Sequence, residues 1–152
     1  MFGWLKSKKI SIFAPADGEV VGLEEVPDEV FSSRLAGDGV AIKPTSGIFV
    51  APMDGIVSKI FPANHAFVIK NGDTEVIVHI GIDTVDLKGS GFVRIANEGD
   101  NVKAGDEIIK ADLDYIANHA RSTITPVVVS NSKIVIKQMG EIKKTTLIME
   151  VE

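Results

Sequence analysis

Two histidines are the side chains whose type and setting best suit chemistry in this sequence: His65 in PANHAFVIK and His79 in EVIVHIGIDTV. Both lie in largely apolar segments. Three interpretations are open. The pair is a chance cross-strand contact, it belongs to a metal site with Asp83 or Glu75 as third ligand, or one imidazole is a nucleophile and the other its partner.

Motifs for the competing chemistries are missing from the sequence. HExxH does not occur and no third histidine stands at ligand spacing, which argues against a metal site. Cysteine is absent and GxSxG does not occur, so there is no thiol and no recognisable serine nucleophile. A nucleophile in this chain would have to be imidazole itself.

Phosphoryl transfer suits a pair of imidazoles. A neutral ring nitrogen attacks a phosphoryl donor and forms a phosphoramidate, which passes the group on readily. The other nitrogen of that ring must keep its proton and donate it, so that the attacking nitrogen presents its lone pair. A second imidazole can hydrogen-bond the phosphoryl oxygens, and surrounding apolar residues slow hydrolysis by excluding water.

The segment EVIVHIGIDTV, residues 75–85, has the composition of a β-strand, and its faces follow from counting by two. One face is wholly apolar and contains Val76, Val78, Ile80 and Ile82. The other contains Glu75, Ile77, His79, Gly81 and Asp83. His79 is therefore predicted to lie on the second face, away from the core.

The loop NGD, residues 71–73, separates this strand from the one that contains His65, and Asn-Gly is a hairpin signal. A three-residue loop at 71–73 pairs Lys70 with Thr74 and puts His65 opposite His79. A two-residue loop at 71–72 puts His65 opposite Val78 instead. Because a slip of one residue reverses the face, only the first register brings the imidazoles together.

Short β-branched segments divided by glycine and proline predict an all-β sandwich or barrel. Two short helices are expected, one in PDEVFSSRLAG with Asp28 as cap and Gly37 as stop, and one in DLDYIANHAR. His119 in the second is interpreted as a surface residue. APADGEV (14–20) matches APMDGIV (51–57) at five of seven positions, which suggests two related β units packed together.

The chain is expected to form a single domain over residues 13–152 after a flexible N-terminal segment, 1–12. The net charge of −5 argues against nucleic acid as the main partner and suits a basic protein partner. Without cysteine, the protein fits the cytoplasm. No segment has the length of a membrane span, and residues 1–9 would make at most weak contact with a membrane surface.

Several segments, in order along nearly the whole chain after residue 13, resemble the glucose class of enzyme IIA. That family belongs to the bacterial phosphoenolpyruvate-dependent sugar phosphotransferase system. The segments are VPDEVFSSRLAGDGVAIKP (26–44), VAPMDGIV (50–57), NHAFVI (64–69), VHIGIDTVDLKGSGF (78–92), GDNVKAGD (99–106) and STITPVVVSN (122–131). The resemblance implies an antiparallel β-sandwich with one or two short helices and a shallow apolar depression around two histidines.

The resemblance also implies roles for the two histidines. His79 would be phosphorylated on Nε2 while its Nδ1–H donates to the backbone carbonyl of Gly81. His65 would support the phosphoryl group. The phosphocarrier protein HPr would supply the phosphate, which would pass to a cysteine in the IIB domain of a sugar permease. No cofactor is implied.

A partner-binding rim is carried over by motif as well. It comprises four apolar residues, Phe31, Phe61, Ile77 and Val85, together with Gly81, and two acids that would meet an arginine of the partner, Asp28 and Asp83. Ala63 departs from the family pattern, in which threonine is often found at that position, so hydrogen bonding near the site is expected to differ.

Two rival functions are also compatible with parts of the sequence. VRIANEGDNVKAGDEIIKAD resembles the strand pattern of biotinyl- or lipoyl-type carrier modules, but the hairpin tip NGD contains no lysine to be modified. A zinc hydrolase would use His65, His79 and a carboxylate, and two histidines leave that ligand set incomplete.

Overall fold

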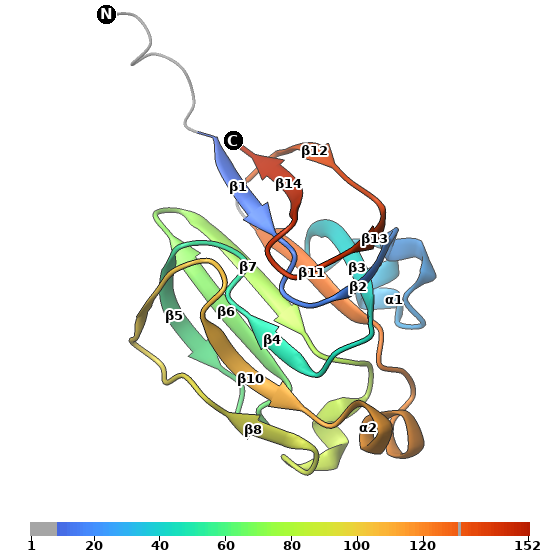
Figure 1. Cartoon of the computed structure of the whole chain (residues 1–152). Helices are drawn as coiled ribbons and strands as arrows, with labels where there is room; N and C mark the ends of the chain where they lie inside the picture. The colour runs from blue at the N-terminus through green and yellow to red at the C-terminus, as the bar shows by residue number, and fades with distance from the viewer. Residues whose placement is uncertain (1–8, 131) are drawn as a thin grey trace, which may run out of the picture.

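Short strands make up most of the chain in the computed structural model, which describes residues 9–130 and 132–152 (Figure 1). The strands are β1 (Ile10–Phe13), β2 (Gly18–Val21), β3 (Asp38–Pro44), β4 (Ile48–Val50), β5 (Gly55–Ile60), β6 (Ala66–Asn71), β7 (Thr74–His79), β8 (Phe92–Arg94), β9 (Asn101–Val102), β10 (Glu107–Ala111), β11 (Thr125–Ser130), β12 (Ile134–Lys137), β13 (Gly140–Ile142) and β14 (Leu147–Val151). Two α-helices, α1 (Glu29–Ser32) and α2 (Leu113–His119), and two 3-10 helices, η2 (Leu23–Glu25) and η3 (Thr84–Leu87), interrupt them.

The strands pair antiparallel in three sheets. One has eight strands in the order β13-β2-β3-β11-β7-β6-β5-β9, and the others are β1-β14-β12 and β4-β10-β8. The main core takes side chains from all three sheets, among them Ile12, Phe49, Val78, Ile109 and Met149. Because the stacked sheets bury their apolar faces against one another, the predicted antiparallel sandwich with short helices is confirmed.

The echoed segments lie against each other as a local two-fold pair. The N–H of Phe13 donates to the Pro52 carbonyl (2.7 Å), and the N–H of Val50 donates to the Pro15 carbonyl (2.8 Å). In the alignment of the echo Phe13 corresponds to Val50 and Pro15 to Pro52, so these bonds are equivalent. The predicted pair of related β units is therefore a structural repeat.

This repeat extends through the described part of the chain. We call β4–β10 the inserted half and β1–β3 together with β11–β14 the split half. The eight-stranded sheet takes β13-β2-β3-β11 from the split half and β7-β6-β5-β9 from the inserted half, and each half adds one three-stranded sheet. The halves meet at the central β11–β7 pair, where Val127 lies opposite Val78.

Element ends differ in places from those expected. The Asp28 side chain caps α1 as predicted, accepting from the N–H of Val30 (2.9 Å), but α1 ends at Ser32 instead of continuing to Gly37. Strand β1 begins at Ile10, before the predicted domain start at residue 13, and residues 1–8 of the predicted N-terminal segment lie outside the described residues. None of the described helices is long and apolar enough to cross a membrane.

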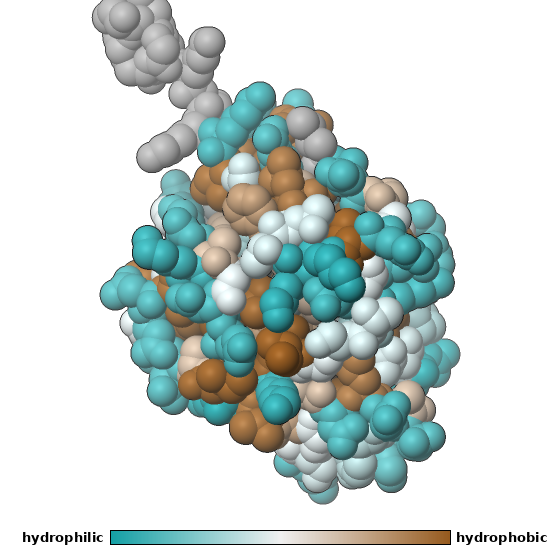
Figure 2. Space-filling model, viewed as in Figure 1, coloured by the Kyte–Doolittle hydropathy of each residue, from teal (hydrophilic) through white to brown (hydrophobic). Residues whose placement is uncertain are grey.

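Apolar side chains also reach the surface at the edge of one sheet. Figure 2 shows them over β8 and β10, where Val93 is 61% exposed and Ile95 is 44% exposed. Val93 lies in the edge strand β8 and Ile95 directly follows it, and neither lies in the two predicted histidine segments.

Candidate functional site

Strand β7 places His79 as the alternation predicts. Val76 and Val78 are fully buried in the main core, while Ile77 and His79 are half-buried on the opposite face. The core therefore holds the strand through one face and leaves the imidazole on the other.

The β6–β7 hairpin has a register that differs from both predicted ones. Asn71 pairs with Thr74, so the turn consists of Gly72 and Asp73, and Ala66 lies opposite His79. Gly72 has φ of 60°, which a type II′ turn requires at its first central position. Both predicted registers are therefore wrong, because the turn begins one residue later than Asn-Gly suggested.

The two imidazoles nevertheless meet, because His65 precedes β6 and is free of strand alternation. A tight turn leads into it, with the N–H of Asn64 donating to the Phe61 carbonyl (2.7 Å) and Asn64 at φ of 61°. The His65 carbonyl accepts from the N–H of Ile80 (2.7 Å). The His65 and His79 rings lie edge to face, 5.0 Å apart between centroids and inclined by 85°.

A backbone carbonyl sets the tautomer of His79. Its Nδ1 lies 2.7 Å from the carbonyl oxygen of Gly81, which can only accept, so Nδ1 carries the proton and Nε2 presents a lone pair. Burial lowers the pKa of His79, and the Gly81 carbonyl and the charges of Asp28 and Asp83 partly oppose that shift. The ring is therefore neutral and nucleophilic at Nε2 near pH 7.

His65 is more deeply buried, with 4% of its surface exposed. Burial, and then the charge of His79, lower its pKa from 6.5 to about 4. Its Nδ1 is the one buried side-chain nitrogen or oxygen without a hydrogen-bond partner in the part of the chain that the structure describes. Ala63, which has no hydroxyl, lies with His65 in the wall of a hollow of about 570 Å³.

Aromatic and apolar residues surround the two rings. The Phe31 ring lies 5.0 Å from His79, and the Phe61 ring lies 5.6 Å from His65. Val85, 54% exposed, lines the same hollow as Phe61 and His65. Ile77 packs against the buried cluster that contains Phe31. The predicted apolar residues are therefore gathered around the histidines, although Phe31 itself is only 8% exposed.

The two predicted acids and the predicted glycine also lie at the site. Asp28 and Asp83 are close enough for their charges to act on His79. Asp28 is the cap of α1, and Asp83 precedes η3 with φ of 62°. Gly81 is buried and contributes its carbonyl, so it orients His79 and does not form part of the exposed rim.

Sequence reasoning missed three residues near the site. Lys88 lines the hollow beside His65, and the ammonium group of Lys59 lies 4.7 Å from the centroid of the Phe61 ring. Thr84, fully buried, donates its hydroxyl to the Ile80 carbonyl. Only Thr84 had a signal, as a polar residue on the apolar alternation Val76, Val78, Ile80, Ile82.

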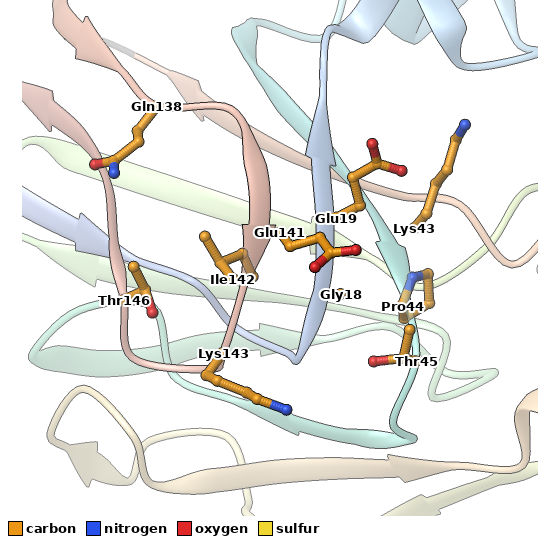
Figure 3. A pocket seen from close by; sticks show the side chains of 10 residues that line it. All are labelled: Gly18, Glu19, Lys43, Pro44, Thr45, Gln138, Glu141, Ile142, Lys143 and Thr146. Carbon is orange, nitrogen blue, oxygen red and sulfur yellow. The ribbon is translucent and has the colours of Figure 1, made fainter.

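The described residues contain no group of three His, Asp or Glu side chains that could hold a metal ion. A separate hollow of about 740 Å³ lies at the ends of β13, β2 and β3 (Figure 3). It is lined by charged and polar side chains such as Glu19, Lys43 and Glu141, and no histidine reaches it. Among the described residues, the histidine pair is therefore the candidate site that we consider further.

Residues 10–135 match the model of a protein family described as phosphoenolpyruvate-dependent sugar phosphotransferase system, EIIA 1. The chain belongs to this EIIA family. The match runs from β1 into β12 and includes both histidine segments.

Relatives place the chain in the glucose class of EIIA. The glucose-specific EIIA component of Haemophilus influenzae is 48% identical over 141 residues, which cover 90% of this chain and 85% of that protein. The solved structure of glucose permease IIA from Mycoplasma capricolum matches with a TM-score of 0.91 at 38% identity, covering 95% of this chain and 96% of that one. The comparisons give no support to a biotinyl- or lipoyl-type carrier or to a zinc hydrolase.

Some EIIA units are parts of longer proteins. The N-acetylglucosamine-specific EIICBA component of Klebsiella pneumoniae is 54% identical over 123 residues, which cover 80% of this chain and 19% of that protein. As its name states, one chain there combines EIIA with the IIB and IIC parts. This supports a partnership between EIIA units and permease domains.

Proposed function

We propose that this EIIA protein is a phosphotransferase component of sugar transport that carries a phosphoryl group on Nε2 of His79. The main support is the 2.7 Å hydrogen bond from His79 Nδ1–H to the Gly81 carbonyl, which leaves the ring's free lone pair on Nε2. Family membership and the second imidazole, at 5.0 Å, support the same role.

Transfer to His79 is a substitution at phosphorus. The Nε2 lone pair attacks phosphorus, the new P–N bond forms, and the bond to the donor breaks with its electron pair remaining on the donor. The Nδ1 proton stays on the ring, hydrogen-bonded to the Gly81 oxygen. His65 hydrogen-bonds the phosphoryl oxygens, and the apolar neighbours slow hydrolysis by excluding water.

The donor is phospho-HPr and the acceptor is the IIB domain of a glucose-type permease, both in the cytoplasm. Relatives that combine EIIA with IIB and IIC in one chain support the acceptor. Phe61, Ile77 and Val85, with the edge of Phe31, form the apolar contact surface. Asp28 and Asp83 add negative charge beside it, which fits a basic partner.

The test is incubation with phosphoenolpyruvate, enzyme I and HPr, followed by mapping of acid-labile, base-stable phosphate. We expect the label on His79. Label on His65 or His119 instead, or none with active donor proteins, would overturn the proposal.

Partner binding is tested with Asp83→Asn, since asparagine tolerates the left-handed backbone at this position. Loss of a rim charge should slow association with HPr, most clearly at low salt. Asp73→Asn, at the opposite end of β7 in the hairpin turn, removes the same charge and should leave association unchanged. Equal association rates for both variants would contradict a role of Asp83 in docking.

A further inference from the structure

The dipeptide Ile80–Gly81 connects the backbones and rings of both histidines. The N–H of Ile80 donates to the His65 carbonyl (2.7 Å), and the Gly81 carbonyl accepts the Nδ1–H of His79 (2.7 Å). The Ile80 N–H and the Gly81 carbonyl belong to the peptides on either side of the one that links the two residues, so a change in the backbone dihedral angles of Ile80 or Gly81 would disturb these contacts. Residues that fix the backbone of this dipeptide therefore also fix its contacts with the two histidines.

The backbone after His79 is unusual and needs such support. Gly81 has φ of 77° and Asp83 has φ of 62°. Glycine adopts positive φ readily, but at Asp83, which has a side chain, the left-handed conformation is costly unless the surroundings determine it. The local backbone preference alone would not keep the Gly81 carbonyl directed at His79.

Thr84 contacts this dipeptide in two ways. Its hydroxyl donates to the Ile80 carbonyl (2.8 Å), which no other described residue bonds. Its methyl group covers Gly81, where a Cβ would lie 2.6 Å from Thr84 Cγ2 and 2.8 Å from the Ser122 carbonyl oxygen. Ser122 adds a second support, because its carbonyl accepts from the N–H of Ile82 (2.9 Å).

We propose that Thr84 is a positioning residue for His79: its buried hydroxyl holds the Ile80 carbonyl and its methyl group packs on Gly81. Together they fix the backbone that directs the next carbonyl, that of Gly81, at Nδ1–H of His79 and so leave Nε2 free to take the phosphoryl group. The proposal rests on the proposed function for its rate effect, while its effect on the tautomer stands independently. Thr84 itself is fully buried and does not reach the phosphoryl group.

The test compares Thr84→Val, which keeps the shape and loses the hydroxyl, with Thr84→Ser, which keeps the hydroxyl. Nitrogen-15 NMR of the imidazoles reports the tautomer of His79, and single-turnover labelling by phospho-HPr reports the rate. We expect Thr84→Val to show mixed tautomers and label about tenfold more slowly, the equivalent of one lost hydrogen bond. Thr84→Ser should keep one tautomer and label within about twofold of wild type.

A matched control lies at the start of β7, the strand that contains His79. Thr74 is also buried, and its hydroxyl lies 2.7 Å from Ser132 Oγ. Thr74→Val removes a comparable hydrogen bond and should change neither the tautomer nor the rate. If Thr84→Val does not fold, Thr84→Ala against Thr84→Ser isolates the hydroxyl with a smaller change.

Three results would overturn the proposal: a single Nδ1–H tautomer and normal rate in Thr84→Val, equal defects in Thr84→Ser and Thr84→Val, or the same defect in Thr74→Val. Failure of the proposed function would look different, because wild-type His79 would then take no label. The tautomer ratio of the variants would still decide the role of Thr84.

Discussion

The split half and the inserted half share one strand arrangement, but only the inserted half contains the histidine site. Strand pairing relates residues of the two halves. Lys43 pairs with Glu19 in the split half, and Lys70 pairs with Ile56, the echo equivalent of Glu19, in the inserted half. Continued along the sheet, this correspondence matches His79 with Val128 and His65 with Asp38. The two histidines therefore lie on only one copy of a repeated scaffold.

The halves differ in what covers the outer face of the eight-stranded sheet. In the split half, η2 and α1 lie between β2 and β3, and they bury Val128 in a cluster with Leu23, Val26 and Phe31. In the inserted half, residues 61–65 alone join β5 to β6, and the face around His79 is only half-buried. A short connection thus leaves open a face that a longer connection closes.

The largest effect is expected from replacing His79 with valine, the residue type at the corresponding position, Val128, of the split half. His79→Val should accept no phosphate from phospho-HPr, because no nucleophilic nitrogen remains at the position. It should fold with a free energy of unfolding within about 1 kcal/mol of wild type, since valine suits a half-buried strand position. Labelling and urea unfolding test both expectations.

His119→Val is the control for that substitution, since His119 is exposed on α2. It should be labelled like wild type. Acid-labile label on His79→Val would mean that another residue accepts the phosphoryl group.

Substituting the second histidine separates acceptance from donation. His65→Gln keeps a hydrogen-bond donor but cannot carry positive charge. The variant should still be labelled on His79 and should pass the group to IIB more slowly, by up to the ~10²–10³ that loss of an electrostatic donor costs elsewhere. Two single-turnover rates measure this, one with phospho-HPr as donor and one with IIB as acceptor.

Two outcomes would contradict this division of labour. A folded variant that takes no label would show that His65 is needed for attack. Wild-type values for both rates would make His65 a bystander.

Acid should weaken the inserted half through His65. Its pKa falls from 6.5 to about 4 on folding, so the unfolded chain binds the additional proton. The free energy of unfolding should therefore be fully retained above about pH 6.5 and fall by roughly 3 kcal/mol as the pH approaches 4. Urea unfolding at several pH values measures the loss.

Carboxylates titrate in the same pH range, so the prediction concerns the difference in the free energy of unfolding between wild type and His65→Gln. The variant should lose less stability between pH 6.5 and 4. Parallel pH curves would show that His65 keeps its proton affinity on folding.

The smallest expected effect tests the repeat itself. Thr145 N–H donates to the Ala14 carbonyl as Gly105 N–H donates to the Ala51 carbonyl, and both residues are left-handed, with φ of 69° and 96°. Glycine suits this backbone and a β-branched residue does not. Thr145→Gly should therefore raise the free energy of unfolding by about 1 kcal/mol.

The reverse exchange should have the opposite sign. Gly105→Thr introduces a Cβ at 3.2 Å from Thr145 Cγ2 as well as backbone strain, and should be destabilising in urea unfolding. Destabilisation by Thr145→Gly would mean that the two turns are not equivalent.

Local patterns in the sequence were enough to predict much of the site. Alternation in EVIVHIGIDTV put His79 on the face opposite Val76 and Val78, because side chains alternate in any strand. The echo at 14–20 and 51–57 predicted the paired units, since the same turn residues form the same turns. Asp28 was predicted as a helix cap from its type and position alone.

Only the tertiary structure decided how His65 reaches His79. Asn-Gly and Gly-Asp can both form tight turns, and the choice of Gly72-Asp73 depends on which strand faces the core buries. The left-handed Asn64 then turns His65 out of the strand pattern, which no periodicity predicts. The half-buried face around His79 depends on where α1 packs: it closes the face over Val128 and reaches His79 only with the Phe31 ring, a consequence of packing between segments distant in sequence.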